Sequence, residues 1–188
     1  MSNEARIDRA AELRAKLLAS RPGTFDDDPY HWIITIGKEG LEELRPDVEP
    51  YLTHADGEIR SAALRCLVFY WALPDCRDLA LRMLEADPDP HVRAVALMGI
   101  GGYYVGTRNA PVLDLLARLL YDRSQPYLVR AAAYVPLLKV GAVARQDLPS
   151  FAPSGDKLDS AVDWRLVERI LADAGVKIPK RDSVPRAR

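Results

Sequence analysis

The stretch Asp89-Pro90-His91-Val92-Arg93-Ala94-Val95-Ala96-Leu97 occurs in three related versions along this chain of 188 residues. The other two versions cover residues 56–64 and 126–134, and the central arginines lie 33 and then 37 residues apart. A recurrence of this length is typical of stacked helix pairs, because one pair cannot bury its apolar face without a neighbour. The repeat therefore predicts an all-α array and says little about chemistry.

Each version marks the start of a second helix whose apolar face is repeated. Relative to the arginine, positions −1, +3, +4 and +7 are apolar or aromatic in all three versions, which is the spacing of one helical face. These positions hold Ile59, Val92, Val129, Ala63, Ala96, Ala133, Leu64, Leu97, Tyr134, Leu67, Ile100 and Leu137. We expect this face to form the core, and we expect positions +1, +5 and +9 to point away from it.

The remaining patterns complete a helical array. Helices are predicted over residues 4–20, 41–52, 58–73, 76–86, 91–101, 110–121, 127–140 and 159–174. Residues 30–36 favour a helix that Asp28 and Pro29 begin, although their β-branched composition leaves a short strand open. We expect one domain, with an N-terminal helical cap at 1–39, three repeats at 40–140, a C-terminal helical cap at 141–176 and a basic tail at 177–188.

The repeated arginines are predicted to be structural. Asp56 and Asp89 precede Arg60 and Arg93 by four residues, so each carboxylate can cap its own helix and face its own arginine or a neighbour's. Pro126 takes the place of this aspartate in the third version. Arg130 is then left with Asp122 or with no partner.

The run from Ala86 to Leu97 resembles a HEAT repeat of the short bacterial type, also called the phycobilin-lyase HEAT-like repeat. That pattern joins a leading helix, an Asp-Pro-rich turn and a second helix that opens with Val-Arg and small residues, and residues 40–140 carry the resemblance. It implies a right-handed α-solenoid of about four to five antiparallel helix pairs. It also implies a bacterial protein that binds another protein on an inner wall formed by second helices.

Nothing in the sequence points to catalysis, a metal or a cofactor. The three histidines are scattered, no CxxC, HExxH, GxSxG or Walker A pattern occurs, and Cys66 reads as a small buried hydrophobe. The net charge of −1 gives no general attraction to nucleic acid or anionic lipid, although the tail carries +4 against −5 for the rest. With no leader-like or membrane-spanning stretch, we expect a cytoplasmic protein that is not an enzyme and has no evident small-molecule substrate.

Two surfaces are candidates for partner binding. The first is the outward side of the second helices, where Arg65, Phe69, Met98 and Val135 are larger or more apolar than an exposed face needs. The second is a glycine-rich loop at 101–108, which supplies the extra residues of the longer spacing and carries Tyr103, Tyr104 and Arg108. The alternatives are that the tyrosines fill a gap between repeats, and that terminal helices, the tail or a second copy cover the apolar positions.

These features predict a non-catalytic module that holds another protein on its concave surface, as an immunity or inhibitor protein or as an adaptor. The acidic body motivates the immunity form, in which the protein blocks a basic toxin domain. The alternatives are a HEAT-like DNA-binding protein or alkylpurine DNA glycosylase, for which the face offers mainly Arg65 and Lys139, and a bilin-lyase-like chaperone.

Overall fold

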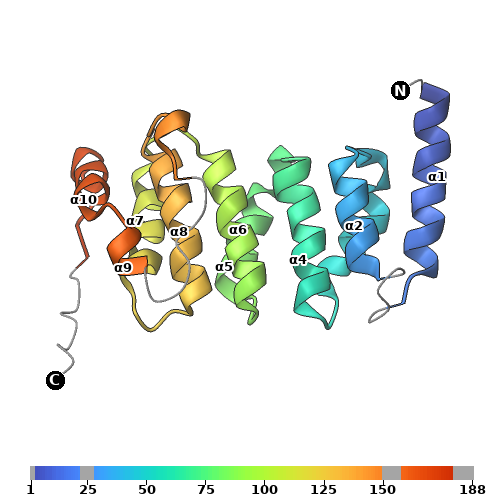
Figure 1. Ribbon diagram of the computed structural model, residues 1–188, viewed down its shortest axis with the longest axis horizontal. Helices are drawn as coiled ribbons and strands as arrows, with labels where there is room; N and C mark the ends of the chain where they lie inside the picture. The colour runs from blue at the N-terminus through green and yellow to red at the C-terminus, as the bar shows by residue number, and fades with distance from the viewer. Residues whose placement is uncertain (1–2, 22–27, 150–157, 180–188) are drawn as a thin grey trace. The chain divides into compact units, whose positions relative to one another are not determined.

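A computed structural model describes residues 3–21, 28–149 and 158–179 of the chain, and every regular element in these residues is helical (Figure 1). The predicted all-α class is confirmed, and the right-handed sense of the array stays a prediction. The chain divides into two compact units, residues 1–99 and 100–188, here called unit 1 and unit 2. The division falls inside α6 (Pro90–Tyr103), and each unit is described by itself.

Unit 1 consists of long and short helical elements. In order they are α1 (Asn3–Ala19), α2 (Pro29–Lys38), η1 (Glu42–Leu44), α3 (Arg45–Val48), η2 (Glu49–Thr53), α4 (Gly57–Arg65), η3 (Cys66–Tyr70), η4 (Pro74–Cys76), α5 (Arg77–Ala86) and most of α6. The predicted helix at 41–52 is present as three short pieces, since Pro46 and Pro50 each lack a backbone donor. Helix α2 packs against α1 and α4.

Unit 2 contains the end of α6, α7 (Ala110–Tyr121), α8 (Tyr127–Val140), η5 (Arg145–Asp147), α9 (Leu158–Ala161) and α10 (Trp164–Asp173). Helices α7 and α8 form the closest pair, and α10 packs against both of them. The predicted helix at 159–174 is broken, because the Asp163 side chain accepts a hydrogen bond from the Leu166 N–H at 3.0 Å and so begins a new helix. The open choice at 30–36 is settled as helix, with Asp28 as its N-cap.

The repeated apolar face forms the core, as predicted. Every residue at positions −1, +3, +4 and +7 is buried, with no side chain more than 4% exposed. The prediction for position +1 is wrong, since Ser61, Ala94 and Ala131 are also buried. These side chains are too short to reach past their neighbours to solvent, so the outward positions of the second helices begin at +5.

Arg60, the first of the two repeated arginines in unit 1, joins two successive turns. The Nε and Nη2 groups of Arg60 donate to the two carboxylate oxygens of Asp87, each at 2.8 Å. Its Nη1 donates to the carbonyl oxygens of His54 and Ala55 at 2.8 and 2.9 Å. The side chains of Arg60 and Asp87 are only 13% and 7% exposed. The sequence predicts Asp56 or Asp89 as the partner of Arg60, and this prediction is wrong. Arg60 binds Asp87, while Asp56 and Asp89 cap their own helices, as expected.

In unit 2, Arg130 makes the corresponding contact. Its Nη2 donates to Asp159 at 3.1 Å, 29 residues ahead. The sequence offers Asp122 or no partner for Arg130, and both expectations are wrong. The Asp122 carboxylate instead accepts hydrogen bonds from Ser124 and Gln125 in its own turn.

Several helix ends use a residue with a left-handed backbone. Gly40 and Gly175 follow α2 and α10 with φ of 68°, as glycine readily does. Ala142 follows α8 with φ of 64°, and the next N–H, that of Val143, donates to the Leu138 carbonyl at 3.0 Å. An alanine in this conformation is strained, because its Cβ approaches the following carbonyl.

We expect Asp87→Asn to lower the free energy of unfolding at pH 7 by about 1–3 kcal/mol, because the partly buried guanidinium of Arg60 loses its counter-charge. Burial is the largest single influence and raises the pKa of Asp87, but the hydrogen bonds from Arg60 and from the Asp89 N–H, together with the positive charge of Arg60, outweigh it, so the pKa lies below its ordinary value. The stabilisation is therefore complete at neutral pH and is lost as pH falls through the lowered pKa. Urea unfolding of both proteins between neutral pH and about pH 3 measures this.

The exposed carboxylate of Asp78, 75% accessible, provides the matched control as Asp78→Asn. If the two variants unfold alike at every pH, the Arg60–Asp87 contact does not stabilise the fold.

We expect Ala142→Gly to raise the free energy of unfolding by about 0.5–1 kcal/mol, since glycine removes the left-handed strain. The reverse change, Gly175→Ala, should lower it by about 1 kcal/mol, because the added Cβ meets no atom within 4 Å and the backbone effect acts alone. Thermal unfolding of the two variants decides this, and a loss of stability in Ala142→Gly would contradict it.

Candidate protein-binding surface

A π-helical turn, η3, holds Phe69 at the surface of unit 1. The predicted continuous helix at 58–73 changes type after Arg65, and the Trp71 N–H donates to the Cys66 carbonyl at 3.0 Å. Such turns occur mostly as single insertions in helices, often at functional sites. Phe69, the fourth of the five residues in this turn, is 45% exposed.

Glycines on two neighbouring helices receive the side chains on either side of Phe69. A Cβ on Gly99 of α6 would lie 2.6 Å from the Val68 side chain, and a Cβ on Gly37 of α2 would lie 2.7 Å from the Tyr70 ring. Neither glycine could be replaced without displacing the turn. The turn is therefore fixed from two sides, and Phe69 is presented outward on a backbone that cannot easily move.

Arg65 ends α4 one helical turn before Phe69. Its side chain is half-buried, and its Nε is buried without a hydrogen-bond partner among the described residues. No carboxylate of the described chain forms an ion pair with it. Its terminal nitrogens are thus left for solvent or for another molecule.

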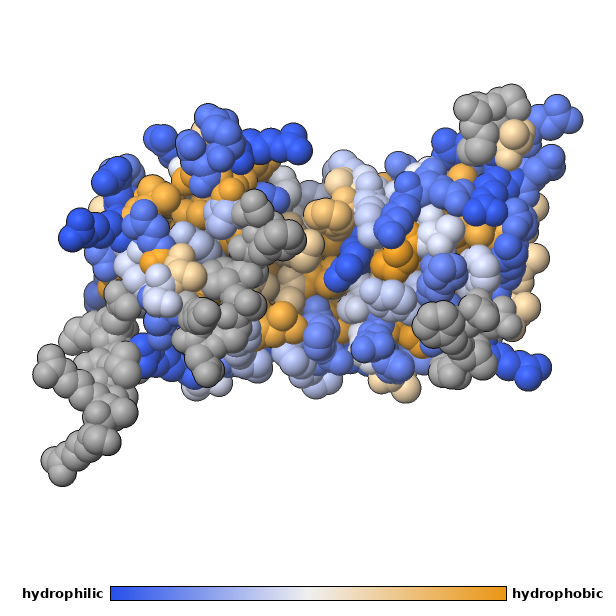
Figure 2. Space-filling model, viewed as in Figure 1, coloured by the Kyte–Doolittle hydropathy of each residue, from blue (hydrophilic) through white to orange (hydrophobic). Residues whose placement is uncertain are grey.

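Met98 completes the candidate surface of unit 1. It directly precedes Gly99, which accepts Val68, and it is 37% exposed. Val68 of η3 packs against Gly99 of α6, and each of these two residues has an exposed apolar neighbour in the chain. The neighbours are Phe69 on η3 and Met98 on α6. Hydrophobic surface is visible at several places on the face that Figure 2 shows, including the region of α2 and α4. We call Arg65, Phe69 and Met98 the Phe69 surface.

The aromatic residues next to Phe69 do not enlarge this surface. The ring of Tyr70 packs edge-on against Phe69 at 5.5 Å between centroids and fills the space at Gly37. Trp71 is only 8% exposed, with its indole Nε1 buried and unpartnered among the described residues. The sequence shows three adjacent aromatic residues, and only the position of the π turn decides which one faces outward.

In unit 2, the predicted loop at 101–108 is partly wrong. Helix α6 continues through Gly101 and Gly102 to Tyr103, so three of these residues are helical. Gly101 serves close packing, since a Cβ there would lie 2.8 Å from Pro136 of α8. The glycine reflects the close approach of two helices rather than a flexible segment.

The residues after Tyr103 are tied to the end of α8. The N–H groups of Gly106 and Arg108 donate to the carbonyls of Lys139 and Val140 at 2.8 and 2.9 Å, which satisfies two carbonyls that end α8. Tyr104, like Tyr103, is half-buried. This agrees with the alternative in which the two tyrosines fill space.

The other candidates of unit 2 are less prominent than those of unit 1. Val135 of α8 is half-buried, and Arg108 is exposed with φ of 49°. Sequence reasoning missed Val105, which is 61% exposed and lies three residues before Arg108. In the sequence, Val105 is an apolar residue between Tyr104 and Gly106. This pattern does not tell whether the valine is exposed or lies in the core.

The described residues offer little for catalysis. Burial raises the pKa of the Cys66 and Cys76 thiols, so neither is a thiolate nucleophile at neutral pH. No group of three His, Cys, Asp or Glu residues in the described ranges could hold a metal ion. No helix among them has the length and apolar character to cross a bilayer.

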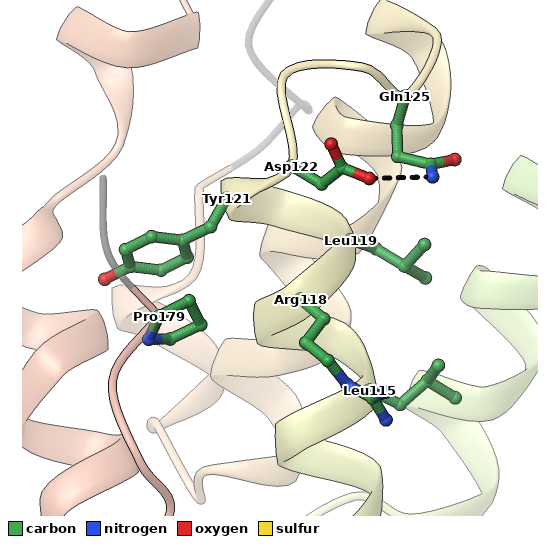
Figure 3. A pocket seen from close by; sticks show the side chains of 7 residues that line it. All are labelled: Leu115, Arg118, Leu119, Tyr121, Asp122, Gln125 and Pro179. Atoms are coloured by element: carbon green, nitrogen blue, oxygen red, sulfur yellow. Dashed lines mark hydrogen bonds between the residues drawn. The ribbon is translucent and has the colours of Figure 1, made fainter. Parts of the chain in front are cut away.

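One open pocket of about 470 Å³ lies along α7 in unit 2 (Figure 3). Its polar side chains are already engaged, since Arg118 pairs with Asp114 at 3.0 Å and Gln125 donates to Asp122 at 3.0 Å. The pocket is lined by Leu115, Arg118, Leu119, Tyr121, Asp122, Gln125 and Pro179. The sequence did not predict this pocket.

Residues 45–137 match the family model described as HEAT repeats. The match covers all three versions of the repeated stretch. No curated protein and no solved structure matches the chain.

We expect Gly99→Ala to destabilise the protein by about 1–3 kcal/mol, because the new Cβ would overlap Val68 and push the π turn away from α6. Phe69→Ala should change stability by less than about 1 kcal/mol, since Phe69 is largely outside the core. Urea unfolding of both variants measures the contrast. A larger loss in Phe69→Ala would mean that Phe69 is a core residue.

Proposed function

Because residues 45–137 are HEAT repeats, we propose that this chain is a non-catalytic module that binds another protein. HEAT repeats generally mediate such contacts, so the family gives the general role. The binding site that we propose is the Phe69 surface of unit 1, made of Arg65, Phe69 and Met98.

The rigid exposure of Phe69 is the observation that carries this proposal. The ring of Phe69 is 45% exposed, which is unfavourable in the isolated protein because apolar surface stays in contact with water. The ring sits on a turn that Gly37 and Gly99 fix in place. Aromatic, Met and Arg side chains are the residues enriched in protein interfaces. A fixed ring also loses little conformational freedom on binding, which favours affinity.

Binding to DNA is less well supported. Contact with several phosphates requires a row of cations, and Arg65 is the only charged residue of the Phe69 surface. The expected immunity or inhibitor role is one narrower form of protein binding. This role rests on the net charge of −5 that the chain carries outside its basic tail. No described contact in unit 1 favours an immunity or inhibitor role over an adaptor role.

We expect Phe69→Asp to abolish capture of the partner, because a charge would replace the central apolar contact. The tagged chain and its variants are incubated with lysate of the source organism, and captured proteins are identified by mass spectrometry. The protein enriched by the wild type is then purified and titrated calorimetrically, where we expect at least a tenfold loss of affinity, as for a central interface residue (about 1.4 kcal/mol or more).

The matched control is Leu18→Asp, which places the same charge on another exposed apolar residue of unit 1, 70% accessible on α1. Leu18→Asp should bind like the wild type. Equal affinity of Phe69→Asp and the wild type would contradict the proposed site, and tight binding to duplex DNA at physiological salt would contradict the proposed function.

A further inference from the structure

We infer that the partner contributes a peptide segment with an acidic side chain for Arg65 and an apolar side chain for Phe69 and Met98. This inference rests on the proposed function and adds the chemistry of the ligand. It starts from Arg65, whose surroundings differ from those of the other half-buried arginines in the same unit.

Each of the other half-buried arginines in the described part of unit 1 has an acceptor. Arg9 pairs with Glu39 at 2.6 Å, and Arg45 and Arg60 also pair with carboxylates. Arg93 donates from Nε to a main-chain carbonyl at 3.1 Å. Arg65 is the exception, and its Nε is buried with no acceptor. A half-buried guanidinium without an acceptor is poorly solvated and gains from an incoming anion.

The buried Nε also orients the rest of the side chain. Because the stem and Nε are packed against unit 1, only the terminal nitrogens remain to meet a ligand. A guanidinium held in this way loses little side-chain freedom when a carboxylate binds it, and its planar fork matches the two carboxylate oxygens.

The neighbours of Arg65 select a peptide carboxylate over a nucleic-acid phosphate. Phe69 and Met98 present apolar surface, which a leucine or aromatic side chain can cover and a sugar–phosphate chain cannot. The single cation of this surface can neutralise one negative charge of a ligand. Nucleic acid carries a negative charge at every nucleotide, so most of its charges would have no partner here.

The spacing on unit 1 sets the spacing expected in the peptide. Phe69 lies four residues after Arg65, which is at most about 6 Å along the axis, because the π turn between them rises less per residue than the 1.5 Å of an α-helix. In an extended peptide, side chains two residues apart lie on the same face, at about 3.3 Å per residue. The ligand should therefore carry Asp or Glu two positions from a large apolar residue.

A displayed library of short random peptides, selected on the intact chain, tests the inference. Peptides that bind the wild type and lose binding on Phe69→Asp should be enriched in Asp or Glu two positions from an apolar residue. One such peptide is then synthesised with its acidic residue or with the matching amide. The amide should bind the wild type about tenfold more weakly, as expected for loss of a charge-assisted pair.

On Arg65→Gln the two synthetic peptides should bind equally, because the pair is already absent. Arg82→Gln is the control, since Arg82 is an exposed arginine of α5 and its replacement changes the net charge identically. Thermal unfolding checks that all variants remain folded.

Three results are decisive. A tenfold acid-to-amide effect on the wild type and on Arg82→Gln, and none on Arg65→Gln, supports the inference. Peptides that need Phe69 but lack an acidic position, or an acid-to-amide effect that survives in Arg65→Gln, would overturn the inference and leave the proposed function in place. If no selected peptide depends on Phe69, both the inference and the proposed binding site are wrong.

Discussion

Two of the three repeated arginines reach from a second helix to an aspartate 27 or 29 residues later, and the arrangement of these repeats depends on this guanidinium–carboxylate contact. In unit 1 Arg60 binds both oxygens of Asp87, and in unit 2 Arg130 binds Asp159. Both arginine side chains are less than 15% exposed. Removing two charges from water is costly, so this contact adds more to the choice of register than to net stability. A repeat shifted by one helical turn would leave a buried guanidinium with no partner.

Once this register is set, close approach of helices determines which residues reach the surface. Gly57 is an example, since a Cβ there would lie 1.8 Å from the carboxylate of Asp89, which caps the following helix. Gly99 accepts Val68 in the same way. Because these glycines have no side chain, neighbouring helical elements pack closely at these points. A large side chain does not fit between them and lies at the surface instead. The exposure of Phe69 is therefore a consequence of packing on its two sides.

Much of the fold could be predicted because the repeated pattern is dominated by burial, which acts on every version alike. The core face and the structural role of Arg60 followed from spacing. The π turn, the extension of α6 to Tyr103 and the partner of Arg130 did not, because each depends on contacts between residues far apart in the chain. Gly101 is instructive: its local sequence is typical of a loop, and its contact with Pro136 makes it part of a packed helix.

Arg60 and Arg65 show how one residue type takes two roles on a single helix. Five residues at 100° each place their side chains about 140° apart around α4, so one faces the turns and the other faces outward. Arg60 has its carboxylate within the chain, and its charge is satisfied on folding. Arg65 is half-buried with no carboxylate partner among the residues that the structure describes, and this is why we assign it to the binding of another molecule. Stability and recognition thus use the same chemistry, and the position of the carboxylate decides which of them an arginine serves.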